Sequence, residues 1–174
     1  MADRGEDTQR LAVRAATPSD VLSLKTFFEE AWKEAGPDAL GFTGATEEAI
    51  HDIASKRFLH SLIARTDRHV VVASKGGRVL GFCALKALGS GVAELSGIVV
   101  LESATGKGIG TRLLRRSGTI AKKRGYERII VKTETSNKRA ISFYKKMGFS
   151  ETKKVSEDIG KAKVKLLVLE ESIS

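Results

Sequence analysis

The sequence predicts a single domain with a mixed α/β fold. Strand-like and helix-like segments alternate along the 174 residues, which indicates the mixed α/β class. No internal repeat is visible, and two prolines without any low-complexity tract argue against an interdomain linker, so one domain is expected. With 41% hydrophobic residues, a chain of this length can bury one core. We expect residues 1–10 to form a polar tail and residues 11–174 to form the domain.

The domain is expected to begin with a strand and two helices. Residues 11–15 alternate as a short strand, and residues 17–20 are a helix-start signal in which Ser or Asp can cap the helix. The apolar side chains that follow recur with helical spacing as far as about residue 33. A glycine-rich stretch over 36–44 breaks this helix, and a second helix should span about 46–62.

Three strands are expected next. The apolar runs 69–74 and 79–85 are joined by the glycine-containing turn 75–78 and therefore predict a hairpin. A third strand should span 92–101. Gly97 lies inside it and predicts a bulge, because glycine is poorly suited to an unbroken ladder.

The last part of the chain alternates again between helices and strands. We expect a helix over 108–124, a strand over 127–133 and a helix over 137–147, followed by strands over 149–154 and 163–169. The complete order, β-α-α-β-β-β-α-β-α-β-β, predicts a mixed α/β sandwich.

The turn that leads into the helix at 108–124 is rich in glycine. Because Gly106, Gly108 and Gly110 have no side chains, successive backbone N–H groups can converge on an anion at the positive end of the helix. Lys107 and Thr111 add a charge and a hydroxyl. The turn therefore predicts a phosphate site, with a tight turn that binds nothing as the alternative.

Two common phosphate-binding motifs are excluded. A P-loop reads G-x-x-x-x-G-K-S/T. The chain has two Gly-Lys pairs, but Gly108 follows the first and Ala162 follows the second, so neither is followed by Ser or Thr. The dinucleotide fingerprint G-x-G-x-x-G fails because Thr111 and Leu113 stand where its third glycine is needed.

A second motif lies about thirty residues downstream, and the two together resemble the GNAT superfamily of N-acetyltransferases. The family loop Q/R-x-x-G-x-G/A is matched by residues 105–110 except at its first position, where Thr105 replaces the long polar side chain. The family helix N-x-x-A-x-x-F/L-Y-x-x-x-G-F is matched at Asn137, Ala140, Phe143, Tyr144, Gly148 and Phe149. The resemblance implies that 11–174 is one N-acetyltransferase domain with a mixed sheet flanked by helices.

The resemblance also implies acetyl-CoA as the cosubstrate. In this family a bulged fourth strand splays from the fifth and opens a slot for the pantetheine arm. Asn137 then either caps its helix or binds the pantetheine amide, and both roles are compatible. The implied cofactor-binding residues are Ile98, Val99, Val100, Thr105, Gly106, Lys107, Gly108, Ile109, Gly110, Thr111, Asn137 and Tyr144.

Acetyl transfer to an amine needs a neutral amine, a stabilised oxyanion and a proton for the departing thiolate. Glu94, 14 residues before Gly108, lies at the offset of the catalytic glutamate in some lysine acetyltransferases of the family and is our candidate base; a solvated strand carboxylate is the alternative. Tyr144 is the candidate acid, and the alternative is a packed core tyrosine. His51, His60 and His69 are further titratable groups, which we expect in surface or core roles.

Charge and composition limit the partners. Residues 106–165 hold 18 Lys and Arg against 5 Asp and Glu, which suits a polyphosphate such as CoA. The same charge would also attract nucleic acid. The small number of aromatic residues and the lack of a recognisable nucleic-acid-binding motif argue against that partner. The single cysteine, Cys83, excludes an internal disulfide, and neither it nor the histidine spacing forms a metal site.

The start of the chain has no apolar leader, and no apolar run in the sequence approaches the roughly 18 residues that a membrane span needs, so we expect a cytoplasmic protein. We also expect a monomer or a homodimer. By resemblance, residues 32–44 and 156–163 select the acceptor amine, and neither carries a diagnostic motif. An acidic set hints at a cationic acceptor, although solvated helix faces also explain it: Glu29, Glu30, Glu34, Asp38, Glu47, Glu48 and Asp52. The alternative function is a catalytically silent acyl-CoA-binding module or a basic protein that associates with nucleic acid.

Overall fold

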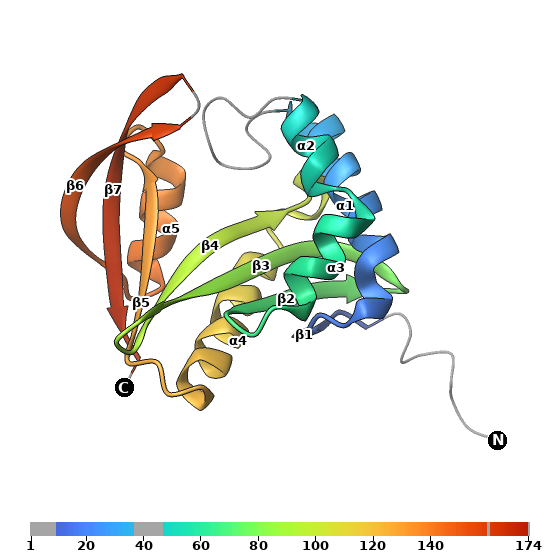
Figure 1. The fold of residues 1–174 in the computed structure, drawn as a ribbon, viewed down its shortest axis with the longest axis horizontal. Coiled ribbons are helices and arrows are strands. Elements are labelled where there is room, and N and C mark those ends of the chain that lie inside the picture. The colour runs from blue at the N-terminus through green and yellow to red at the C-terminus, as the bar shows by residue number, and fades with distance from the viewer. Residues whose placement is uncertain (1–9, 37–46, 160, 174) are drawn as a thin grey trace.

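The computed structural model describes residues 10–36, 47–159 and 161–173. Within these residues, seven strands form one sheet in the order β1-β2-β3-β4-β5-β7-β6 (Figure 1). Neighbouring strands are antiparallel except for β4 and β5, which are parallel. The strands are β1 (Ala12–Ala15), β2 (Arg68–Lys75), β3 (Arg78–Gly89), β4 (Val92–Val100), β5 (Arg128–Glu134), β6 (Ser150–Ile159) and β7 (Ala162–Ser172).

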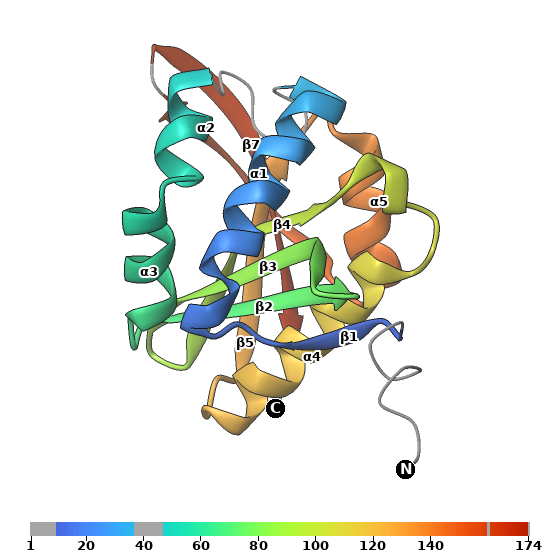
Figure 2. The same cartoon turned by 90° about the vertical axis from the view of Figure 1, so that its right-hand side faces the viewer.

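Helices cover both faces of this sheet (Figures 1 and 2). Helices α1, α2 and α3 lie on one face, and α4 and α5 lie on the other. The predicted mixed α/β fold with a helix-flanked sheet is therefore confirmed. The helices are α1 (Val21–Ala35), α2 (Glu47–Ile53), α3 (Lys56–Ala64), α4 (Ile109–Lys123) and α5 (Lys138–Lys146), with the 3₁₀ turns η2 (Pro18–Asp20) and η4 (Glu102–Ala104).

Several element boundaries differ from the sequence prediction. The second predicted helix is in fact two, because Ser55 leaves helical geometry and caps α3: its hydroxyl accepts the N–H of Phe58 at 3.2 Å. Strands β6 and β7 are also longer than predicted: β6 continues to Ile159, and β7 runs from Ala162 to Ser172. The added residues are mostly polar or acidic, so no apolar run marked them. The break predicted over 37–44 and the helix start at Thr46 lie outside the described residues.

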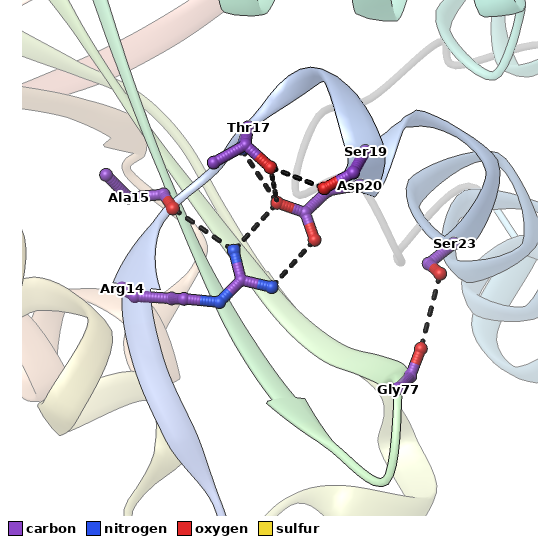
Figure 3. Close-up of polar contacts among 7 residues, drawn as sticks. All are labelled: Arg14, Ala15, Thr17, Ser19, Asp20, Ser23 and Gly77. Carbon is purple, nitrogen blue, oxygen red and sulfur yellow. Dashed lines mark hydrogen bonds and ion pairs between the residues drawn. The ribbon is translucent and has the colours of Figure 1, made fainter.

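An ion pair holds the start of α1 against the sheet (Figure 3). Both guanidinium NH groups of Arg14 donate to the carboxylate of Asp20 at 2.8 Å, and the N–H of Thr17 donates to the same carboxylate at 2.7 Å. The bond to Arg14 lowers the pKa of Asp20 below its ordinary value. Ser23 also donates to the carbonyl of Gly77 in the β2–β3 turn at 3.2 Å, so α1 is fixed at its beginning by two elements.

Helix α4 packs very closely on β3 at Gly81. A Cβ at this position would lie 2.8 Å from Leu113 and 3.0 Å from Ile109, both on α4 and both buried. Only a residue without a side chain lets the helix approach so closely. This contact sets the height of the α4 amino terminus above the sheet.

His69, at the start of β2, is buried, and its Nε2 lies 3.3 Å from the hydroxyl of Tyr126. Burial, assisted by the charge of Arg124, lowers the pKa of His69 below its ordinary 6.5. As the pH falls through about 6.5, the unfolded chain takes up a proton that the folded protein resists, so the free energy of unfolding should decrease.

Urea unfolding at pH 7.5 and pH 5 tests this expectation. We expect His69→Gln to lose less stability between these two pH values than the wild type, by about 1.4 kcal/mol for each unit of lowered pKa. His60→Gln is the matched control, because it makes the same substitution at an exposed position of α3. An equal loss in His69→Gln and the wild type would contradict the assignment.

Candidate functional site

The sheet opens between its two parallel strands. Strands β4 and β5 pair only over Val92–Leu95 and Arg128–Val131. Ala84 on β3 pairs with Gly97 and Leu85 pairs with Leu95, so Ser96 is an extra residue on β4. This confirms the bulge predicted at Gly97, which inserts one extra residue into β4. A bulge bends its strand, and β4 diverges from β5 at this point.

A cleft of about 740 Å³ lies at this opening. Its walls come from β4, the turn after it, the start of α4, the end of β5, α5 and the end of α1. All the predicted cofactor-binding residues except Lys107 line it: Ile98, Val99, Val100, Thr105, Gly106, Gly108, Ile109, Gly110, Thr111, Asn137 and Tyr144. Lys107 is exposed, and Glu94 is half-buried beside Leu95 without being part of the lining.

The glycine turn has the backbone geometry that an anion site requires. Gly106 and Gly108 have φ of 75° and 73°, a left-handed conformation that disfavours other residues, and Gly108 is the N-cap of α4. Gly110 lies within the helix and faces the cleft beside Phe143. Thr105 donates its hydroxyl to the carbonyl of Glu102 at 2.8 Å, so this side chain holds the turn together.

Asn137, which precedes α5, and Tyr144 of α5 line the same cleft. Asn137 caps the helix, because its Oδ1 accepts the N–H of Ala140 at 3.1 Å, and its amide nitrogen stays available as a donor. Tyr144 is only 6% exposed and packs between Phe143 and Phe149, with ring centroids 5.4 and 5.7 Å away. Burial raises the pKa of Tyr144 well above its ordinary value, so the phenol stays protonated.

Sequence reasoning missed Lys132, a lining residue on β5. Its Nζ donates to Oε1 of Glu157 on β6 at 2.5 Å. This bond raises the pKa of Lys132, and the charge of Glu94 adds to the effect, so Glu94 and Lys132 belong to one electrostatic group. Nothing in the strand-like run 127–133 distinguishes Lys132 from a solvated lysine, so no sequence signal marked it.

Glu34, at the end of α1, is a second lining residue with a long-range contact. Its Oε2 accepts the N–H of Glu102 at 2.6 Å, which ties α1 to the turn before the glycine loop. Glu29 and Glu30 instead pair with Lys25 and Arg78. Two members of the acidic set are thus neutralised within the protein, and Asp38 lies outside the described residues.

The remaining titratable candidates lie away from the cleft. His51 and His60 are exposed on α2 and α3, and His69 is buried beside Tyr126. The described residues contain no group of His, Cys, Asp and Glu able to hold a metal ion. None of the helices in the described parts of the chain has the length and apolar character that a membrane crossing requires.

A family model and several curated proteins that are similar to this chain are all acetyltransferases. The model of the acetyltransferase (GNAT) family matches residues 24–149. An uncharacterized N-acetyltransferase of Chlorobaculum tepidum is 31% identical over 118 residues, which are 67% of this chain and 72% of that protein. N-alpha-acetyltransferase 30 of Schizosaccharomyces pombe is 29% identical over 99 residues, 57% of this chain and 55% of that protein, so the match spans about half of its length.

Among solved structures, the PaiA N-acetyltransferase of Thermoplasma acidophilum in complex with coenzyme A aligns with a TM-score of 0.71 and 26% identity. The alignment covers 94% of this chain and 99% of that one. A ribosomal-protein-S18-alanine N-acetyltransferase from Escherichia coli shares the fold with a TM-score of 0.70 at 17% identity, over 95% of both chains.

Proposed function

Because the chain belongs to the acetyltransferase (GNAT) family, we propose that it binds acetyl-CoA in the cleft and transfers the acetyl group to a primary amine by direct attack in a ternary complex. The observation that carries this proposal is that one cleft joins the glycine turn at the start of α4 to the open edge of β4. The acceptor is the amine of a protein N-terminus, a lysine, a polyamine or another small molecule.

The two ends of the cleft suit the two ends of CoA. Backbone N–H groups at the start of α4 would hold the pyrophosphate, where the helix dipole is positive. Ile98, Val99 and Val100 would offer backbone groups to the pantetheine amides as an added strand does, and Asn137 would donate its free amide hydrogen. The coenzyme A complex of the Thermoplasma relative supports this cosubstrate.

Three groups of the chain would carry the chemistry. Glu94 would take a proton from the acceptor amine, which matters most for lysine or polyamine because their pKa near 10.4 leaves few neutral molecules at pH 7. A backbone N–H of residues 98–100 would stabilise the oxyanion. Tyr144 would donate its hydrogen to the departing sulfur; because its pKa is raised, it acts as a hydrogen-bond donor while the C–S bond breaks.

A panel of amines scored by thiol release from acetyl-CoA tests the function. An enzyme should release CoA with at least one amine, whereas a silent binding module would bind CoA without turnover. A nucleic-acid binder would lose affinity for its polyanion steeply with salt and keep it in saturating CoA. Turnover would also identify the acceptor class.

Tyr144→Phe should lower kcat on the order of 10²-fold and leave the acetyl-CoA Kd nearly unchanged. The substitution keeps the ring packing against Phe143 and Phe149 and removes only the hydroxyl. Tyr126→Phe is the matched control. Tyr126 is the other of the two tyrosines in the sequence, and its hydroxyl forms a hydrogen bond with His69 outside the cleft. A kcat within about twofold of the wild type for Tyr144→Phe would mean that the thiolate takes its proton from water.

A further inference from the structure

Lys132 lines the cleft at the point where β4 and β5 part. The last paired residues of the parallel strands are Leu95 and Val131, and Lys132 is the next residue of β5. From Val100, beside the glycine turn, the open edge of β4 runs five residues to Leu95, about 17 Å at 3.3 Å per residue. An extended pantetheine arm has a similar length, so a thioester anchored by its pyrophosphate would end opposite Lys132.

The surroundings of this lysine contain groups able to accept a proton. Glu157 holds the ammonium directly at 2.5 Å, and Glu94 acts on it through charge. The side chain keeps 33% of its surface exposed, so it is not locked in a closed core. Among the described residues that line the cleft, Lys132 is the one lysine.

We propose that Lys132 is itself an acetyl acceptor, so that the protein acetylates its own cleft when no other amine is bound. This inference rests on the proposed function. The Nζ of Lys132 forms a bond to the thioester carbonyl carbon, and the C–S bond breaks. The Lys132 ammonium loses two protons: the first passes to Glu157, which frees the lone pair of Nζ for the attack, and the second passes to Glu94 as the amide forms. The sulfur leaves as thiolate and is protonated by Tyr144 or solvent. The products are N-ε-acetyl-Lys132 and CoA, and no further reactant is needed.

The modification would change the sheet as well as the cleft. Acetylation removes the positive charge of Lys132, and the Glu157 carboxylate loses its ionic partner. Strand β7 lies between β5 and β6, so this ion pair reaches across a strand from β5 to the edge strand. Acetyl-Lys132 would therefore release the side chain of Glu157 on β6, which stays paired with β7, and would also leave Glu94 without its neighbouring cation.

The experiment incubates the full chain with acetyl-CoA and follows acetylation by intact mass and peptide mapping. We expect one acetyl group per chain at Lys132, added at least about tenfold faster than at the exposed Lys165 because the reacting groups are held together. The rate constant should not depend on protein concentration, and excess CoA should suppress the reaction at Lys132 but not at Lys165. Lys132→Arg, which keeps the charge, should lose the rapid phase.

Calorimetry on the same protein separates the two proposals. If acetyl-CoA binds and Lys132 is modified no faster than Lys165, self-acetylation is wrong while the cofactor site stands. A rate constant that rises in proportion to protein concentration would also overturn it, because one chain would then modify another. If acetyl-CoA does not bind, the proposed function itself fails.

Discussion

Gly110→Asp should abolish CoA binding, raising the Kd by on the order of 10²-fold or more, about 2.7 kcal/mol. Gly110 lies in the first turn of α4 and lines the cleft, so the new carboxylate would bring negative charge and bulk to the place where the pyrophosphate is expected. The fold should survive, because an acidic residue in the first turn of a helix interacts favourably with the helix dipole.

Two control variants separate charge, size and place. In Gly110→Ala the added Cβ would lie 3.6 Å from Phe143, an ordinary contact, so binding should weaken far less. Gly118→Asp makes the same charge change in the same helix, at a position with no atom within 4 Å of the new Cβ and outside the cleft lining, and should bind CoA nearly as the wild type does. Near-normal affinity in a folded Gly110→Asp protein, measured by calorimetry, would sink the pyrophosphate assignment.

Glu94→Gln should lower the rate at pH 7 by roughly 10²-fold or more if the acceptor is a high-pKa amine. The loss should shrink as the pH rises toward the pKa of the amine, because solvent then supplies the neutral nucleophile. An α-amine acceptor should lose much less, since about one molecule in ten is already neutral at pH 7. Profiles of rate against pH for both proteins on the best substrate give the measurement.

Glu157→Gln is the matched control for Glu94→Gln. Both substitutions remove a carboxylate that acts on Lys132, but only Glu94 is a candidate base. We expect Glu157→Gln to produce a smaller change that does not recover at high pH. If the wild-type and Glu94→Gln profiles run parallel from about pH 6 to 10, Glu94 is not the base and serves only the structure.

The features that the sequence predicted best are those that depend on the local backbone. The glycine turn, the bulge at Gly97 and the capping role of Asn137 each follow from what one residue type permits at one position. The pairing of β2 with β3 was also predicted, because a short glycine-containing turn joins these two strands.

The missed features depend on residues far apart in the chain. Lys132 looked like any strand lysine until β6 brought Glu157 beside it, and Glu34 meets the backbone of Glu102 across 68 positions. The division between α2 and α3 was missed for another reason: Ser55 interrupts a run whose apolar spacing continues through it. Hydrophobic periodicity reports the buried face of a segment and is insensitive to such a cap.

The short pairing of β4 with β5 gives this sheet an edge inside the molecule. An exposed strand edge normally invites a strand from another molecule and so promotes aggregation. Here the open part of β4 beyond Leu95 lines a cleft whose other walls include Ala35 of α1 and Phe143 of α5, so a strand from another molecule would have to enter between these helices to pair with it. We therefore expect the hydrogen-bonding groups of this edge to favour a narrow, amide-containing ligand over a strand from another molecule.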